Sequence, residues 1–219
     1  MILALPGFLY YLLTAEGKNR YKPLPIYGPK LLAKTTHTVK GKAIPDTIFH
    51  TLGDFNLKDQ NNNPISFKTF TNKILVVNFF YTHCTTGCNQ VNINVDSLAS
   101  GYAKNKMVYF VTITVDPARD SVSTLKSYAA GLKPKTPNWL FLTGDTSTIY
   151  NLARKGLLVD AMQAGKNDFI YSNKLILVDS EKRIRGYYSG TLMNDVILLN
   201  DEIKVLITEE IRKNDKPLY

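Results

Sequence analysis

The feature that most constrains the fold is a continuous apolar run at residues 73–81 (KILVVNFFY), which ends three residues before Cys84. Runs of this kind are typical of a strand that is buried on both faces of a sheet. Residues 90–104 then carry apolar side chains at helical spacing, and residues 107–115 form a second apolar run. A strand, a helix and a strand in this order predict a parallel crossover unit.

The flanking segments extend this unit into one α/β domain. Upstream, residues 55–67 hold two short apolar stretches around a polar tip, which predicts a β-hairpin. Downstream, the expected order is helix, strand, helix, strand, strand and helix, at residues 121–132, 139–142, 146–157, 170–178, 183–188 and 191–213. We therefore predict a thioredoxin-like α/β fold over residues 47–213, with a central mixed sheet, flanking helices, an N-terminal β-hairpin and a tail at 214–219.

The N-terminal segments differ from the domain in composition. Residues 1–14 are almost wholly apolar, but a membrane-spanning helix needs about 20 such residues. We interpret residues 1–16 as the end of a membrane anchor or signal-anchor; the alternative is a short apolar segment packed on the domain. Residues 17–46 contain four prolines and, up to Lys42, seven Lys or Arg and no acid, which predicts a basic, extended linker.

The charge of the chain limits the classes of partner. Its formal net charge of +9 favours acidic partners. The lysines are scattered, and neither a recognition helix nor an aromatic RNA-binding motif is present, so nucleic acid is not a predicted partner. The basic linker suits an anionic lipid surface. Basic residues just after an anchor usually stay in the cytoplasm, so export of the domain would require more positive charge before Met1.

The sequence has two cysteines, Cys84 and Cys88, which are too few for a disulfide-stapled small domain. They lie between a predicted buried strand and a predicted helix. The free N–H groups and the positive dipole end of a helix N-terminus lower the pKa of a nearby thiol. We predict that the pair is reactive and that Cys84 is the more nucleophilic sulfur; the alternative is two buried, inert cysteines.

The spacing of the pair limits its geometry. Residues four apart on a regular helix have Cβ atoms about 5–6 Å apart, whereas a disulfide needs about 3.5–4.5 Å. Cys84 is therefore expected in the loop or in a bent first turn, and Gly87 would permit the bend. Reduced and oxidised forms are then both accessible, and two thiolates at this spacing would also suit Cu(I).

Four segments give the chain a family resemblance: NFFYTHCTTGC at 78–88, TVDPARD at 114–120, WLFLTG at 139–144 and LILVDSEKRIRGYYSG at 175–190. From about residue 47 to 212 the chain resembles the Sco/SenC family. The CxxxC pair with VDPxRD distinguishes this family from CxxC thioredoxins and most peroxiredoxins. The resemblance implies a membrane-tethered, extracytoplasmic (periplasmic) domain that binds copper through two Cys and one His. It also implies a role in maturing the copper centre of cytochrome c oxidase, by delivering metal or reducing cysteines.

The chain departs from the family pattern near the dithiol. Thr85 and Asn89 stand where members usually have proline, and the family's His position falls on Tyr171. A phenol is a poorer ligand for Cu(I) than an imidazole. His83 is a candidate third metal ligand or an electrostatic stabiliser of the Cys84 thiolate, although on an extended segment its side chain would point away from that of Cys84.

Other polar residues have structural interpretations. His37 and His50 are expected on the solvated surface. Asp116, Arg119 and Asp120 follow a strand end, where we expect a turn with a helix cap by Asp120 or Ser121. An aspartate there would also shape the surroundings of the dithiol.

These observations leave three functional hypotheses. The first is a Sco-like assembly factor that acts on the copper-site subunit of cytochrome c oxidase or on another dithiol protein. The second is a metal-independent thiol–disulfide oxidoreductase or a peroxidase-like enzyme, since thiol exchange needs no imidazole. The third is a binding module without chemistry. We expect Cys84 and Cys88 to be the catalytic residues and, where copper binds, its ligands together with His83.

Overall fold

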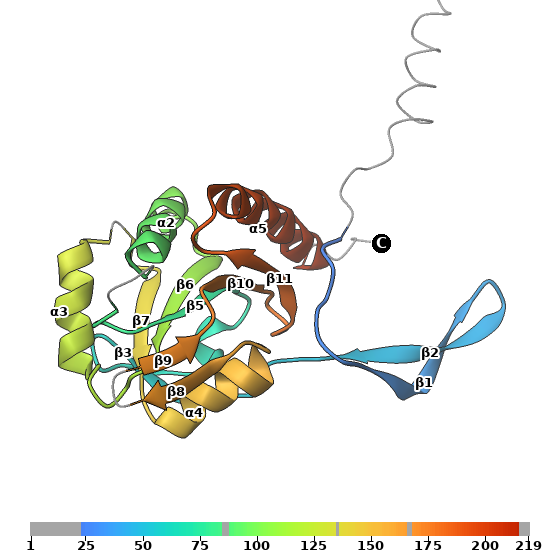
Figure 1. Cartoon of the computed structure of the whole chain (residues 1–219). Helices are drawn as coiled ribbons and strands as arrows, with labels where there is room; N and C mark the ends of the chain where they lie inside the picture. The colour runs from blue at the N-terminus through green and yellow to red at the C-terminus, as the bar shows by residue number, and fades with distance from the viewer. Residues whose placement is uncertain (1–22, 85–87, 135, 166–167, 215–219) are drawn as a thin grey trace, which may run out of the picture.

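The computed structural model describes residues 23–84, 88–134, 136–165 and 168–214. A seven-stranded mixed sheet in the order β11-β10-β5-β6-β7-β3-β4 forms its centre (Figure 1). The three middle strands are parallel: β5 (Ile74–Phe80), β6 (Val108–Thr114) and β7 (Trp139–Thr143). Antiparallel strands extend both sides: β10 (Lys174–Val178), β11 (Ile184–Ser189), β3 (Leu57–Asp59) and β4 (Pro64–Ile65).

Strand β5 is the apolar run that the sequence places at the centre of the sheet. Every residue of β5 is buried, because β10 and β6 pair with its two edges and side chains from helices and loops cover both faces. The parallel register with β6 runs from Ile74 opposite Val108 to Phe80 opposite Thr114. The two strands therefore end side by side, at the edge from which the loop to Cys84 leaves.

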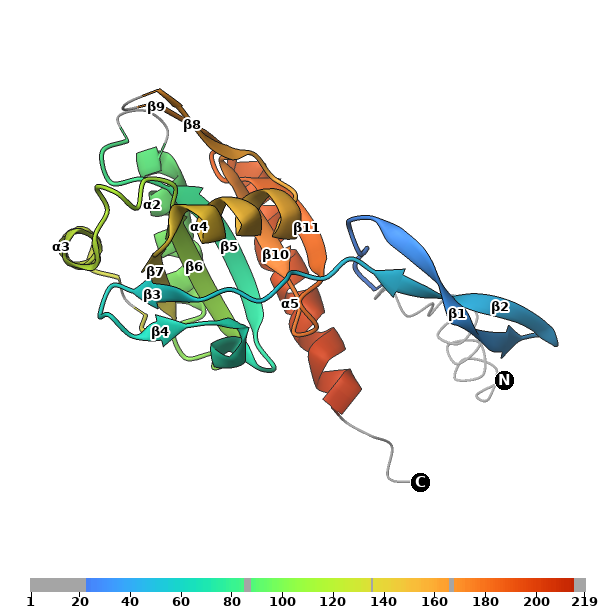
Figure 2. The same ribbon diagram turned by 90° about the horizontal axis from the view of Figure 1, so that it is seen from below.

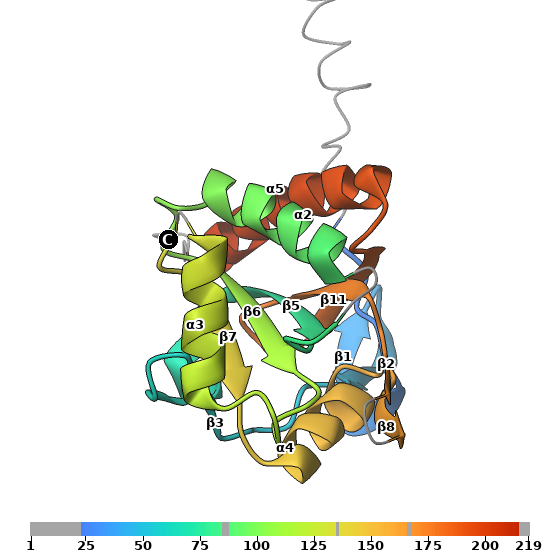
Figure 3. The ribbon, with the colours of Figure 1, turned by 60° about the vertical axis from the view of Figure 1, so that its left-hand side comes forward.

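Helices cover both faces of the sheet. Figure 3 shows helices α2 and α5 on one side and helix α4 on the other. The first side is formed by α2 (Cys88–Gly101), α3 (Val122–Leu132) and α5 (Met193–Asn214). The other is formed by α4 (Thr146–Asn151), which continues as a π-helical turn η2 (Leu152–Gly156), and by the 3₁₀ turn η1 (Phe67–Phe70).

Two helix starts follow directly from the sequence. The Ser121 hydroxyl accepts a hydrogen bond from Thr124 N–H, and the Asp145 carboxylate accepts one from Thr148 N–H at 2.9 Å. Side-chain acceptors at these positions satisfy N–H groups that have no partner within the helix. Asp145 caps α4, and of the two candidate caps for α3 the structure uses Ser121.

Each face of the sheet has its own hydrophobic core. Phe80, Phe110 and Trp139 pack under α2, α3 and α5, whereas Val77 and Ile113 pack towards α4 and η1. Burial of aromatic and branched side chains of this size is the main source of stability for such a layer.

The prediction of a single strand over residues 170–178 is wrong. The structure has a separate hairpin, β8 (Ala161–Gly165) with β9 (Asp168–Tyr171), and a break before β10. The break occurs because Ser172 and Asn173 bond elsewhere: Ser172 N–H donates to the Asp160 carbonyl, and the Asn173 carbonyl accepts from Gly190 N–H. Tyr171 consequently lies at the end of a short hairpin rather than inside the central sheet.

The expectation of an extended linker without a defined element is also wrong for residues 30–46. There the chain forms strand β1 (Lys30–Val39) and part of strand β2 (Lys42–Phe49), an antiparallel hairpin that projects from the domain (Figure 2). Lys40 and Gly41 at its turn both have positive φ, 49° and 78°, which matches the two-residue turn that suits the twist of a hairpin. Alternating β-branched and polar residues are compatible with such strands, but the prolines obscured this pattern.

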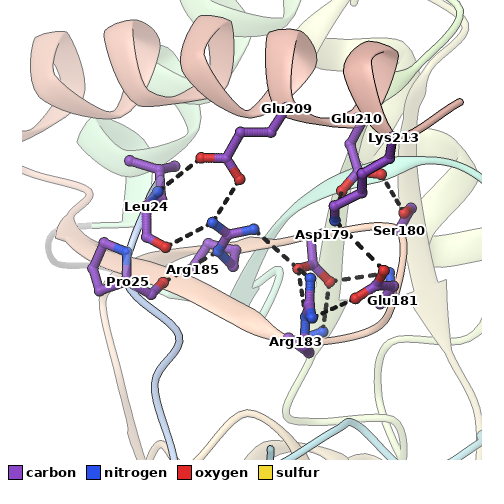
Figure 4. A network of polar contacts seen from close by, with 10 residues as sticks. All are labelled: Leu24, Pro25, Asp179, Ser180, Glu181, Arg183, Arg185, Glu209, Glu210 and Lys213. Carbon is purple, nitrogen blue, oxygen red and sulfur yellow. Dashed lines mark hydrogen bonds and ion pairs between the residues drawn. The ribbon is translucent and has the colours of Figure 1, made fainter. Parts of the chain in front are cut away.

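The chain before the hairpin is attached to the domain by a buried polar network (Figure 4). The Arg185 guanidinium, 2% exposed, donates to the Leu24 carbonyl at 2.7 Å and pairs with Glu209 at 2.7 Å and Asp179 at 3.1 Å. The other Glu209 oxygen accepts from Leu24 N–H at 2.7 Å. Tyr27 N–H then donates to the Ile184 carbonyl at 2.9 Å, so residues 24–27 pack on β11 and α5.

The predicted anchor, residues 1–16, and the tail, residues 215–219, lie outside the described residues. Within the described ranges, no helix combines the length and the apolar character that crossing a bilayer requires.

Replacing Arg185 with methionine should destabilise the fold by about 3 kcal/mol, because Glu209 and two carbonyl groups lose a buried donor. Chemical denaturation followed by Trp139 fluorescence measures the free energy of unfolding. Lys204→Met is the matched control: its ion pair with Asp201 is exposed and should contribute less than about 1 kcal/mol. Equal midpoints for the two variants would show that the network does not hold the N-terminal segment.

Candidate functional site

The candidate site is the loop that connects β5 to α2. Cys84 lies in this loop, half-buried, and its N–H donates to the Tyr81 carbonyl at 3.2 Å. Cys84 is disulfide-bonded, and Cys88, the other cysteine of the sequence, is the first residue of α2. The bend expected at Gly87 falls in residues 85–87, which lie outside the described residues.

Asp120 attaches this loop to the neighbouring strand. Its carboxylate is fully buried and accepts hydrogen bonds from Thr82 N–H at 3.0 Å, from the Thr82 hydroxyl and from the Thr114 hydroxyl. Three donors replace the water that the carboxylate loses on burial. Asp120 is therefore not the cap of α3; it fixes the backbone two residues before Cys84 against the end of β6.

Asp116 and Arg119 form the turn that presents Asp120. The Arg119 guanidinium pairs with the Asp116 carboxylate, and Asp120 N–H donates to the Asp116 carbonyl at 2.9 Å. The guanidinium carbon also lies 5.8 Å from the ring centre of Phe169 on β9. The expectation of a structural turn is confirmed, and the turn connects the loop of Cys84 with the hairpin that carries Tyr171.

Tyr171 is the residue that the hairpin brings to the dithiol. Its hydroxyl oxygen lies 3.4 Å from the Cys84 sulfur. A disulfide sulfur carries no hydrogen, so the phenol is the donor in this contact. Burial, with smaller contributions from Tyr81 and Tyr128, raises the pKa of Tyr171 to about 12. The phenol therefore keeps its proton throughout the physiological pH range.

Two sets of contacts hold the segment that contains Tyr171. The Tyr81 ring meets the Tyr171 ring edge-on at 5.8 Å. Two residues after Tyr171, the chain is linked to Gly190, whose N–H donates to the Asn173 carbonyl at 3.0 Å and whose carbonyl accepts from the Asn94 side chain of α2 at 2.8 Å. A Cβ at Gly190 would lie 2.7 Å from that carbonyl, so only glycine fits.

The structure does not bring a histidine onto the Cys84 sulfur. The His83 side chain is exposed, and its Nδ1 lies 3.0 Å from the Thr82 hydroxyl oxygen. His37 is exposed, as expected, on the projecting hairpin, where it pairs with Asp46. The expectation of a solvated surface is wrong for His50, which is half-buried with Nε2 2.7 Å from the Gly156 carbonyl oxygen.

The side chains that the structure places around Cys84 do not fit a three-ligand copper site. Cu(I) is held best by thiolate and imidazole, and the side chain beside the Cys84 sulfur is a protonated phenol, that of Tyr171. Within the described residues, no group of three or more His, Cys, Asp or Glu side chains could hold a metal ion. What the described arrangement provides is a disulfide-forming cysteine with a hydroxyl donor beside it.

Reasoning from the sequence missed two parts of this site. One is the β8–β9 hairpin, whose signal was weak because its strands are short and largely exposed. The other is the bond between Thr82 and Asp120, which are 38 residues apart and share no sequence pattern. The register that assigned Tyr171 to the family's His position placed the phenol on a segment that does contact Cys84.

Comparison with known proteins identifies the family of the chain. Residues 46–206 match the family model described as SCO1/SenC. The SCO1 protein homolog of Bacillus subtilis is 26% identical over 163 residues, which cover 72% of this chain and 84% of the relative.

Two solved structures show a similar fold. BsSco, described as a member of the Sco family of cytochrome c oxidase assembly proteins with a disulfide switch, has a TM-score of 0.65 at 23% identity and covers 73% of this chain and 94% of its own. Yeast Sco1 with copper bound has a TM-score of 0.58 at 22% identity, and the match covers 77% of this chain and 96% of the yeast chain. Because the family match includes the loop of Cys84, Asp120 and Tyr171, we conclude that this chain belongs to the SCO1/SenC family and has its thioredoxin-like fold.

Proposed function

We propose that this protein is a membrane-anchored, extracytoplasmic thiol–disulfide reductant in the assembly of the copper centre of cytochrome c oxidase. One observation carries the proposal: Cys84 is disulfide-bonded and half-buried, with the Tyr171 hydroxyl 3.4 Å from its sulfur. This arrangement serves thiol exchange, whereas a copper site would need a third soft ligand. The disulfide switch described for BsSco supports the same chemistry.

The proposed reaction transfers two electrons from the reduced dithiol to a disulfide of the partner. The Cys84 thiolate attacks one partner sulfur, and the other partner sulfur leaves as a thiolate. The Cys88 thiolate then attacks the Cys84 sulfur, which releases the reduced partner and forms the Cys84–Cys88 disulfide. An external dithiol must reduce this disulfide before the next cycle, and the copper-site subunit of the oxidase is the proposed partner.

Two features of the site favour the attacking thiolate. The Tyr171 hydroxyl is 3.4 Å from the Cys84 sulfur and, with its raised pKa, remains a donor at any working pH. Helix α2 begins at Cys88, so the positive end of its dipole lies beside the loop. Both effects stabilise negative charge on sulfur and lower the pKa of the thiol.

Asp120 contributes by holding the loop in place. Its bonds to the Thr82 N–H and hydroxyl fix the backbone that leads to Cys84. Its charge is balanced by hydroxyl and amide donors in the buried site, so it supports the loop without a direct bond to the cysteine.

Copper delivery is the second candidate function. The copper-bound structure of yeast Sco1 and the two-cysteine motif favour it. In this chain copper would be cargo held by two thiolates, with His83 as the nearest imidazole in sequence. The phenol at position 171 does not fit the metal as a third ligand.

The dithiol should reduce a peptide disulfide with a stoichiometry of one per chain, because the pair holds two electrons. Cys84→Ser should abolish this reaction, and Cys88→Ser should stop it at a mixed disulfide that mass spectrometry detects. The proposal fails if Cys84→Ser retains activity.

Oxidation by hydrogen peroxide at the rate of an ordinary thiol would remove the peroxidase-like alternative, and a fast, Cys84-dependent reaction would favour it.

Tyr171→Phe should raise the pKa of the Cys84 thiol by about one unit, because the thiolate loses a hydrogen-bond donor worth about 1.5 kcal/mol. At neutral pH the thiolate fraction then falls, and alkylation of Cys84 becomes slower. The pH dependence of the alkylation rate gives the pKa. Tyr187→Phe is the control, since that hydroxyl donates to the Leu157 carbonyl away from the cysteine. An unchanged pKa in Tyr171→Phe would contradict the assigned donor.

Tyr171→His should increase the Cu(I) affinity at least about tenfold, because an imidazole would replace a phenol beside the thiolates. Competition with a coloured Cu(I) chelator measures the affinity of the reduced protein. Tyr171→Phe adds no ligand and should not increase the affinity. If the histidine variant binds copper no better than the wild type, residue 171 is not the position of the third ligand.

A further inference from the structure

The hairpin of β1 and β2 has an unusual surface that the dithiol chemistry does not use. It projects beyond the domain, on the opposite side from α3 (Figures 1 and 2). Five large apolar side chains on it are exposed: Leu32 at 75%, Leu31 at 66%, Ile48 at 54%, Ile44 at 43% and Val39 at 42%. Apolar side chains at such exposure, grouped on one element, mark interaction surfaces.

The strand register places four of these side chains, all except Leu32, on one face. Leu31 pairs with Ile48, and Val39 pairs with Lys42. Alternate residues of β2 point to the same side, so Ile44 shares the face of Ile48. Leu31, Val39, Ile44 and Ile48 are called here the apolar face of the hairpin. The same side of the hairpin also carries Lys42 and the His37–Asp46 pair. The opposite face carries Lys30, Leu32, Thr36, Thr38, Ala43, Pro45, Thr47 and Phe49.

The charge around this face has one sign. Lys30, Lys34, Lys40 and Lys42 are exposed on the hairpin. The single acid, Asp46, is already paired with His37 at 2.6 Å. A partner that covers the apolar face must therefore combine an apolar interior with negative charge at its surface. A second copy of this hairpin would bring lysines against lysines.

We propose that the apolar face of the hairpin docks onto an anionic lipid surface, with the lysines at the level of the headgroups. This combination of apolar side chains and basic flanks is the one that binds at lipid interfaces. The inference is independent of the dithiol and of the oxidase. It would hold for this chain with any chemistry at Cys84.

The length of chain before the described structure supports this occupant. The apolar run that the sequence predicts as an anchor ends at residue 14, and the described chain begins at residue 23. The intervening residues, 15–22, span at most about 30 Å when fully extended. Residues 24–27 are bonded to β11 and α5, so an anchor of this kind would keep the hairpin close to a bilayer.

A two-stranded hairpin alone is only marginally stable in water, and burial of the apolar face in lipid would stabilise it. The hairpin then gives the domain a second contact with the membrane besides the anchor. Two contacts fix an orientation, whereas a single tether leaves the domain free to rotate.

Depth-dependent quenching of an introduced tryptophan tests this proposal. The full chain is reconstituted in vesicles that contain brominated lipid, with or without phosphatidylglycerol. Ile44→Trp reports on the apolar face. Thr38→Trp reports on the opposite face, and the Thr38–Ala43 pair is the next pair in the ladder after His37–Ile44. Both variants share the same anchor, and the native Trp139 is 1% exposed and gives a constant background.

In anionic vesicles, Ile44→Trp should be quenched about twofold more than Thr38→Trp, because only its face enters the lipid. Without the anionic lipid, this difference should shrink as the lysines lose their attraction. Val39→Trp, on the same face, should repeat the result of Ile44→Trp and guards against a variant that disrupts the hairpin.

Equal quenching of the two faces, or no quenching of either, would overturn the proposal. It would also be overturned by a blue-shifted emission of Ile44→Trp without lipid that depends on protein concentration. That result would show that a second copy covers the face instead.

Discussion

The parallel pairing of β5 with β6 is the constraint on which the rest of the site depends. Both strands are buried, and their register makes Phe80 and Thr114 end at the same edge of the sheet. The chain that leaves β5 towards Cys84 therefore starts beside the turn that carries Asp120. The bonds from Thr82 and Thr114 to the buried Asp120 carboxylate are the direct result, and they fix the approach to the cysteine.

Tyr171 is the side chain that bears most directly on the chemistry of Cys84. The hairpin β8–β9 places at the dithiol a residue that remains a protonated hydrogen-bond donor, since burial raises its pKa to about 12. A donor stabilises a thiolate but contributes little to binding a soft metal ion. We therefore propose that Tyr171, which the sequence predicts at the position of the family's third copper ligand, supports sulfur chemistry instead. Copper affinity and thiol reactivity at Cys84 are expected to respond in different ways to substitution of this one residue.

The N-terminal region has a structural role that its composition does not reveal. Arg185 and Glu209 hold the backbone at Leu24, and Tyr27 pairs with β11, so the chain before the hairpin is part of the domain. The projecting hairpin continues from this fixed point. A basic, proline-containing sequence can therefore form ordered strands, because its ends are fixed by contacts with residues far away in sequence.

The sequence by itself determined the central elements, because apolar runs and side-chain caps such as Asp145 act locally. It also determined that Cys84 and Cys88 lie between a core strand and a helix. Only the tertiary structure decided that Thr82 meets Asp120, that Tyr171 meets Cys84 and that Arg185 holds Leu24. These contacts join residues far apart in the chain, and no local periodicity encodes them. The hairpin at residues 30–49 belongs to the same class, since its strands are stabilised by each other and not by a pattern within either one.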